Sequence, residues 1–226
     1  MYTLDPDTYS HIVQLLPIDS INDLRLTASS NSQQLSALRN TDNFWKLRLE
    51  KFLDIQITLN PAPQTWHQVY TKITTGDLNL SQKLITFAQA GDFLVVRLLV
   101  EAGADVTSDN NVALRAASAN GHLQVVKVLL EAGANVTAND NLALRQASQN
   151  GRLKVVQVLL AAGADVTADN NFALIHASAE GHAQVVQLLL NTKADVTAGI
   201  NSALREASSH GHSKVVQLLI QAGATL

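Results

Sequence analysis

Apolar residues recur along most of this chain with the spacing of short amphipathic helices. The wider of two neighbouring apolar stripes consists of Val125, Val126, Leu129 and Leu130. Their spacing of one and four residues places them on one face of a helix. A narrower stripe of alanine and leucine runs between residues 112 and 120. Gly121 separates the stripes and Gly133 follows the second, as expected of glycines that take the left-handed conformation where a helix ends.

This pattern returns every thirty residues. The turn glycine alone recurs five times, at Gly91, Gly121, Gly151, Gly181 and Gly211. Self-similarity with a fixed period of this length is typical of solenoids, in which each copy buries its apolar face against its neighbours. We therefore predict an all-α solenoid of five helix-turn-helix repeats over residues 79–226. The repeats are expected at 79–108, 109–138, 139–168, 169–198 and 199–226.

Polar residues at the start of the first helix complete the repeat. An asparagine stands there in four copies, at Asn111, Asn141, Asn171 and Asn201. Short polar side chains can cap the free N–H groups of a helix, so we predict that these asparagines are helix caps.

The fourth and fifth copies depart from this pattern. Lys193 replaces the terminating glycine, and Ile200 replaces an Asn or Asp. A non-glycine residue at positive φ costs on the order of 1 kcal/mol. The junction between these copies should therefore be the least stable one or be differently shaped. Ile200 is either an exposed anchor or a core residue, and we favour the second.

The second half of each copy closely resembles the ankyrin repeat. Gly121-His122 and the runs 125–130 and 132–136 carry the resemblance. The first half departs from it, because the family period is about 33 and the family's Thr-Pro-Leu-His is here Val-Ala-Leu-Arg, at residues 112–115. The missing residues fall in the finger between repeats, which should be short and blunt. Arg115, Arg145 and Arg205 replace the family histidine, and its usual hydrogen bonds between repeats are in question. The resemblance implies a protein that binds other proteins, and the short copies are similar to those of giant-virus and Legionella-type ankyrin proteins.

Differences between the copies indicate where such an array would bind. Three rows of positions, offset by four and eight residues, lie on one face of the first helix, which lines the concave side of ankyrin arrays. The rows vary from copy to copy. We predict a target-binding strip formed by Gln146, Phe172, His176, Glu180, Glu206 and His210. The alternative, drift at solvated positions, stays open.

The first 77 residues break the period and read as short helices. One interpretation is an N-terminal cap that seals the first repeat. Residues 4–6, 12–17, 23–26 and 43–47 also resemble an F-box, with 41 positions between Leu4 and Trp45. Asp5 departs from that family because it splits the Leu-Pro pair. The expected division is an F-box-like helical domain at 1–55 and a linker or N-terminal cap at 56–78.

The F-box resemblance implies a partner, the Skp-type adaptor of a Skp–cullin–F-box ubiquitin ligase. The residues that would bind this adaptor are Leu4, Pro6, Ile12, Leu15, Leu16, Leu24, Leu26 and Trp45. The array would then hold a target for ubiquitination, and a bacterial or viral source would make the protein an effector. An ankyrin scaffold or inhibitor without a ubiquitin link is the alternative.

Composition excludes some classes of partner and indicates where the protein acts. The net charge is −3, which is too acidic for an electrostatic grip on nucleic acid or on an anionic membrane. The chain has no cysteine, no signal-peptide pattern at its start and no apolar run of about 18–20 residues. We expect a cytoplasmic protein, in the host cytoplasm if it is a secreted effector.

No constellation of residues indicates catalysis. His122, His182 and His212 occupy the Gly-His turn and lie one or more repeats apart, which is too far for a shared metal. His210 and His212 could meet, but no carboxylate or thiol cluster joins them. We therefore expect no catalytic residues, no metal, no cofactor and no enzymatic activity.

Overall fold

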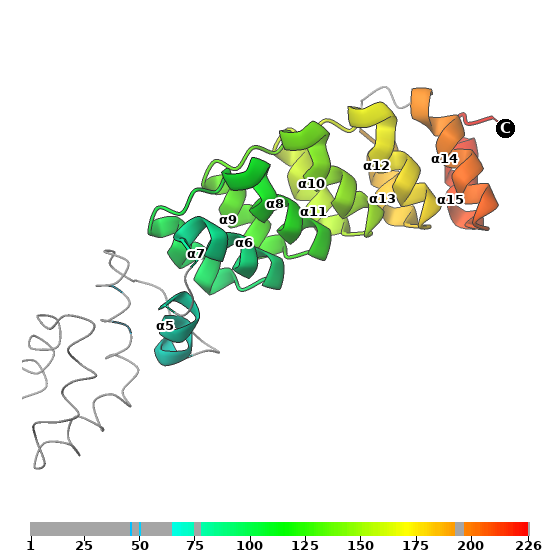
Figure 1. Ribbon diagram of the computed structural model, residues 1–226. Helices are drawn as coiled ribbons and strands as arrows, with labels where there is room; N and C mark the ends of the chain where they lie inside the picture. The colour runs from blue at the N-terminus through cyan, green and yellow to red at the C-terminus, as the bar shows by residue number, and fades with distance from the viewer. Residues whose placement is uncertain (1–45, 47–49, 51–64, 75–77, 193–196, 226) are drawn as a thin grey trace, which may run out of the picture. The chain divides into compact units, whose positions relative to one another are not determined.

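The computed structural model describes residues 46, 50, 65–74, 78–192 and 197–225 (Figure 1). The chain forms two compact units, Met1–Asp77 and Leu78–Leu226, and the second is called the array below. In the first unit, helix α5 spans Trp66–Thr74 and buries Val69 and Ile73 completely. Thr65 and Gln68 form a reciprocal cap at its start, with N···O distances of 2.9 and 3.3 Å. The side chains of Lys46 and Glu50 form an ion pair at 3.7 Å.

The array consists of helix pairs that stack in chain order (Figure 1). The pairs are α6 Leu80–Ala90 with α7 Phe93–Glu101, α8 Ser108–Asn120 with α9 Leu123–Glu131, α10 Ala138–Gln149 with α11 Leu153–Ala161, α12 Ala168–Ala179 with α13 Ala183–Leu190, and α14 Thr197–Ser209 with α15 Ser213–Gln221. The part of the chain that the structure describes contains helices and no strand, so the predicted all-α solenoid is confirmed there.

A continuous apolar core runs through the array. The same leucine of each first helix is buried in four successive pairs, at Leu114, Leu144, Leu174 and Leu204. Valines of the second helices, such as Val126 and Val156, are equally inaccessible. The predicted stripe is confirmed with one change, since Val128 is buried and Leu130 is only half-buried. Burying one such aliphatic side chain contributes about 1.5–3 kcal/mol.

The backbone is left-handed at the start of three of the first helices. In α8, Asp109, Asn110 and Asn111 have φ values of 52°, 57° and 62°, and residues 139–141 and 169–171 repeat this geometry. Asparagine and aspartate tolerate this region better than other non-glycine residues, although usually singly. Residues of these types therefore suit the left-handed start of α8, α10 and α12.

The predicted role of the asparagines as helix caps is wrong. Asn111 and Asn141 are buried, and each accepts a hydrogen bond from a loop backbone N–H 24 residues later rather than from its own helix. The Oδ1–N distances are 2.7 Å to Asn135 and 2.8 Å to Asp165. Asn201 makes the same bond to Thr225 at 2.8 Å, and Ser81 makes it to Asp105 at 2.9 Å. The position in the repeat, and not the left-handed conformation, determines this bond, because Asn201 and Ser81 make it without positive φ.

The start of α14 differs from the starts of α8, α10 and α12, as the sequence predicted for this junction. Residues 199–201 are helical without positive φ, which suits the β-branched Ile200. Ile200 is 6% exposed, so its prediction as a core residue is confirmed. A side chain on Gly199 would overlap Asn171 of the preceding pair, so only glycine allows this close approach. Lys193 lies outside the described residues.

Candidate functional site

The predicted target-binding residues lie on or directly after α10, α12 and α14, which are neighbours in the array. Gln146, Phe172 and His176 are half-buried, whereas Glu180, Glu206 and His210 are exposed. The structure brings some of these residues together in pairs. It records no hydrogen bond or ion pair of the Gln146 or Glu180 side chain among the described residues.

The most ordered feature of this surface is an aromatic stack on α12. The rings of Phe172 and His176 lie 3.6 Å apart between centroids, with an interplanar angle of 19°. One helical turn separates the two residues, so the helix itself aligns the rings. The guanidinium carbon of Arg145, on α10, lies 4.1 Å from the Phe172 ring centroid, which is within the range of a cation–π contact.

An ion pair fixes the arginine of this stack. Nη2 of Arg145 lies 2.7 Å from Oδ2 of Asp169, at the start of α12. The Arg145 side chain is 16% exposed, and its Nε has no hydrogen-bond partner. Arg145, Asp169, Phe172 and His176 together are called the Phe172 cluster below. The cluster joins two successive helix pairs and holds the aromatic rings in one geometry.

A second pair of predicted residues meets at the end of α14. Nδ1 of His210 lies 2.9 Å from the carbonyl oxygen of Glu206 and 3.9 Å from the Glu206 carboxylate. The shorter contact is a hydrogen bond from the ring to the backbone, and the carboxylate lies beyond hydrogen-bond distance. Both side chains are about half exposed, so they present an acid and an imidazole to solvent.

Sequence reasoning did not include Arg145 and Asp169 in the binding strip. From the sequence, Arg145 was interpreted only as a replacement of the ankyrin histidine, whose usual hydrogen bonds between repeats were not expected to be certain here. The structure gives Arg145 a contact between helix pairs through Asp169 instead. No signal in the sequence identified this pair, because only the structure shows that residues 24 positions apart meet, as Asn111 and Asn135 also do.

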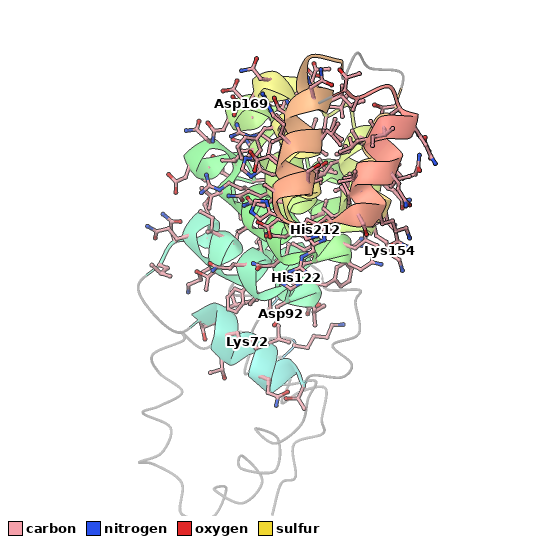
Figure 2. All side chains as sticks on the ribbon, turned by 90° about the vertical axis from the view of Figure 1, so that its right-hand side faces the viewer. Lys72, Asp92, His122, Lys154, Asp169 and His212 are labelled. Atoms are coloured by element: carbon pink, nitrogen blue, oxygen red, sulfur yellow. The ribbon has the colours of Figure 1, made fainter. Side chains whose placement is uncertain are left out.

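The histidines of the Gly-His turn have a structural role, as the family resemblance implied. Nε2 of His122 lies 3.0 Å from the carbonyl oxygen of Gln89, and that of His212 lies 2.8 Å from the carbonyl oxygen of Ala179. Figure 2 shows His122 and His212 at the opposite end of the helices from Asp169. Arg152 has the same role in the corresponding turn, where its Nε donates to the carbonyl oxygen of Ala119 at 3.1 Å.

An Asp or Asn side chain stabilises each of the three loops that join helix pairs between α7 and α12. Oδ1 of Asp105 accepts hydrogen bonds from the N–H and the hydroxyl of Thr107, at 2.8 and 2.7 Å. The Ser108 hydroxyl donates to Oδ2 at 3.2 Å. These bonds, led by that of the Thr107 hydroxyl, lower the pKa of the Asp105 carboxyl below its usual value. Asn135 makes the same two bonds to Thr137 without a charge.

The predicted adaptor-binding residues lie outside the described residues. They are Leu4, Pro6, Ile12, Leu15, Leu16, Leu24, Leu26 and Trp45. The F-box-like domain therefore stays a prediction from the sequence.

The described residues show neither a metal-binding cluster nor a membrane-spanning helix. Nowhere among them do three or more His, Asp or Glu side chains come close enough to hold a metal ion. None of the described helices is both long and apolar enough to cross a membrane.

A family model of ankyrin repeats in three copies matches residues 73–140 and 144–226, more than half of the chain. The chain belongs to the ankyrin-repeat family. No curated protein matches it in a sequence search. The ankyrin repeats give this protein a role in protein–protein interaction, and proteins of the family are typically scaffolds without enzymatic activity.

Proposed function

We propose that the ankyrin array recognises a target protein with the surface of α10, α12 and α14, centred on the Phe172 cluster. The observation that carries this proposal is the fixed position of the Phe172 ring. Arg145 holds it from the preceding helix pair at 4.1 Å, and His176 stacks on it at 3.6 Å. An aromatic ring that is ordered before binding loses little conformational entropy when a partner covers it.

The surroundings of Phe172 suit a protein partner. Aromatic residues and arginine are enriched in protein interfaces, where a few such residues carry most of the binding energy. Polar and charged side chains surround the cluster, with Gln146 on one neighbouring helix and Glu206 on the other. This arrangement of an apolar centre with a polar rim is typical of interfaces that form between folded proteins.

Photocrosslinking followed by affinity measurement tests the target surface. A crosslinking amino acid at Ser202 of α14 should capture the target, whereas the same residue at Lys127, on a second helix, should not. With the identified and purified target, Phe172→Ala should weaken binding at least tenfold. Phe93→Ala is the matched control, because Phe93 is 37% exposed on α7. Equal affinities of the two variants, or capture only from Lys127, would contradict the proposal.

We propose further that residues 1–55 bind a Skp-type adaptor and so connect the target to a ubiquitin ligase. The spacing from Leu4 to Trp45 supports this second step. The division of the chain into two compact units fits a protein with one binding task in each. A microbial source would make the protein an effector that acts in the host cytoplasm. Without adaptor binding, the protein is an ankyrin scaffold or inhibitor.

Titration calorimetry with purified Skp adaptor tests the second step. The wild-type protein should bind saturably, and the double variant Leu15→Asp, Leu16→Asp should not. Circular dichroism must show that the variant retains its helices. Phe172→Ala, in the array, serves as a control that should bind the adaptor as the wild type does. Absence of wild-type binding at tens of micromolar would leave the scaffold or inhibitor alternative.

A further inference from the structure

The arginine that anchors the Phe172 cluster has a counterpart one repeat earlier. Arg115 occupies on α8 the position that Arg145 occupies on α10. Arg145 meets a carboxylate at 2.7 Å because Asp169 follows it by 24 residues. The residue 24 positions after Arg115 is Asn139, which has no negative charge. The position of the Phe172 ring is taken by Leu142.

Arg115 has no acceptor for its charge. Its side chain is half-buried, yet it makes no hydrogen bond or ion pair with any residue that the structure describes. Asn139 does not replace the acid, since its Nδ2 lies 3.4 Å from the carbonyl oxygen of Asn110 and belongs to the backbone connection. None of its guanidinium nitrogens is buried without a partner, in contrast to Nε of Arg145, so they are open to an approaching anion.

The surface beside Arg115 is open to such an anion. A shallow hollow, partly open to solvent, lies between the start of α8 and the start of α10. Arg115, Asn110, Asn135, Asn139 and Leu142 contribute to its lining. None of the lining residues is acidic, so nothing in the hollow opposes the approach of a negative charge.

We propose that this hollow is a carboxylate-binding site, in which a carboxylate of the target protein pairs with Arg115 as Asp169 pairs with Arg145. The ligand is the side chain of an Asp or Glu or the C-terminal carboxylate of the target. Both present two oxygens that fit the planar guanidinium. The site lies one repeat before the Phe172 cluster, so a single target can cover both. The identity of the ligand as part of a target rests on the proposed function, whereas binding of a carboxylate does not.

Nuclear magnetic resonance on the full chain tests the site with small probes. N-acetylglutamic acid amide carries only a side-chain carboxylate, N-acetylglutamine carries only the terminal one, and N-acetylglutamine amide is neutral. At least one acid should shift the backbone amides of Asn139 and Leu142 and the Arg115 Nε–H saturably. The midpoint is the probe concentration at which half of the maximal shift is reached. The acid with the lower midpoint shows whether a side-chain or a terminal carboxylate is preferred. A neutral probe that shifts these signals equally, or no saturable shift with either acid, overturns the proposal.

Two variants and a control locate the effect. Asn139→Asp places a carboxylate of the chain itself where the next repeat has Asp169. This carboxylate should pair with Arg115 and so raise the midpoint of the acid probe at least tenfold. Arg115→Gln should abolish the shifts of the Asn139 and Leu142 amides. Arg205→Gln changes an exposed arginine of α14 and should leave the midpoint unchanged. An unchanged midpoint in Asn139→Asp, with the remaining spectrum intact, would overturn the proposal.

Affinity measurements with the target identified by crosslinking test this inference separately from the proposed function. Arg115→Gln should lower its affinity at least fivefold. Target binding that is unaffected by Arg115→Gln but lost in Phe172→Ala would overturn the inference that the target supplies the carboxylate and leave the function intact. Probe binding without any target on the array would refute the proposed function and leave the carboxylate site in place.

Discussion

At the scale of single residues, the array carries a column of buried hydroxyl groups that its packing does not satisfy. Ser118, Ser148 and Ser178 are completely buried, and their Oγ atoms have no hydrogen-bond partner. The corresponding residue of the first helix pair is Ala88, which is also completely buried. Alanine therefore fits this position, and serine there costs stability.

Ser148→Ala should stabilise the protein. A buried hydroxyl without a partner costs about 1–3 kcal/mol, so removing it should raise the free energy of unfolding by about 1 kcal/mol. Chemical denaturation measures the change. Ser208→Ala is the control, because Ser208 occupies the same repeat position but is exposed, and it reports the helix propensity of alanine alone. Equal effects of the two substitutions would show that the buried hydroxyl carries no cost.

Asp105 should make the stability of the array depend on acid pH. Its pKa is lower in the folded state, chiefly through the hydroxyl and N–H of Thr107, so folding favours the ionised form. The resulting stabilisation is present above the unfolded pKa, about 3.9, and is lost as the pH falls through the folded pKa. Asp105→Asn mimics Asn135 and removes this dependence. Unfolding of both proteins at pH 7, 5, 4 and 3 should show a constant difference at the upper two values and a change at the lower two. A constant difference at all four values would contradict the assignment.

At the scale of the elements, α14 shows how one residue changes the start of a helix. Residues 109–111, 139–141 and 169–171 are left-handed, whereas α14 continues as a regular helix through Ile200. A β-branched residue is strained at positive φ, and its apolar side chain gains by burial. Both effects favour the helical start, so backbone and packing act in the same direction.

Ile200→Ala should destabilise the array strongly. Deleting a buried isoleucine side chain costs about 2–5 kcal/mol, and Ile200 is 6% exposed. Ile220 is 54% exposed on α15, so Ile220→Ala should change the free energy of unfolding by no more than about 0.5 kcal/mol. Denaturant unfolding of the two variants measures the difference. Similar losses for both would mean that Ile200 does not belong to the core.

At the scale of the whole molecule, the array depends on contacts between neighbouring helix pairs. Histidine or arginine of one turn binds the carbonyl of the preceding pair, as with His122 and Arg152, and Arg145 binds Asp169 of the following pair. In such a protein, stability is close to a sum of repeat terms and nearest-neighbour terms. The array should therefore not require the first unit for folding.

A fragment of residues 78–226 should fold alone. We expect it to keep the helical circular dichroism of the described helices and to unfold cooperatively in denaturant, because Leu78–Leu226 forms a compact unit of its own. The full chain, measured under the same conditions, is the reference. A fragment that lacks helical structure would show that the first unit is an obligatory cap rather than a separate module.

The sequence by itself determined the repeat, the two helices of each copy and their buried faces. These follow from local periodicity, because a helix of fixed pitch places residues such as Val125 and Leu129 on one side. The turn glycines could be predicted for the same reason, since the positive φ of Gly121 is a property of one residue. Of the binding strip, the sequence predicted Phe172 and His176 together, because four residues separate them on a helix.

Only the tertiary structure decided which residues meet across 24 or more positions. Asn111 was expected to cap its own helix, yet its Oδ1 accepts a hydrogen bond from the N–H of Asn135, in the loop that follows the second helix of the same pair. Arg145 reaches Asp169 and the Phe172 ring, whereas Arg115 meets neither an acid nor an aromatic ring among the residues that the structure describes. The two arginines have the same place in their repeats. Their contacts differ because the next helix pair places different residues beside each of them. The spacing of residues along the sequence does not show these contacts.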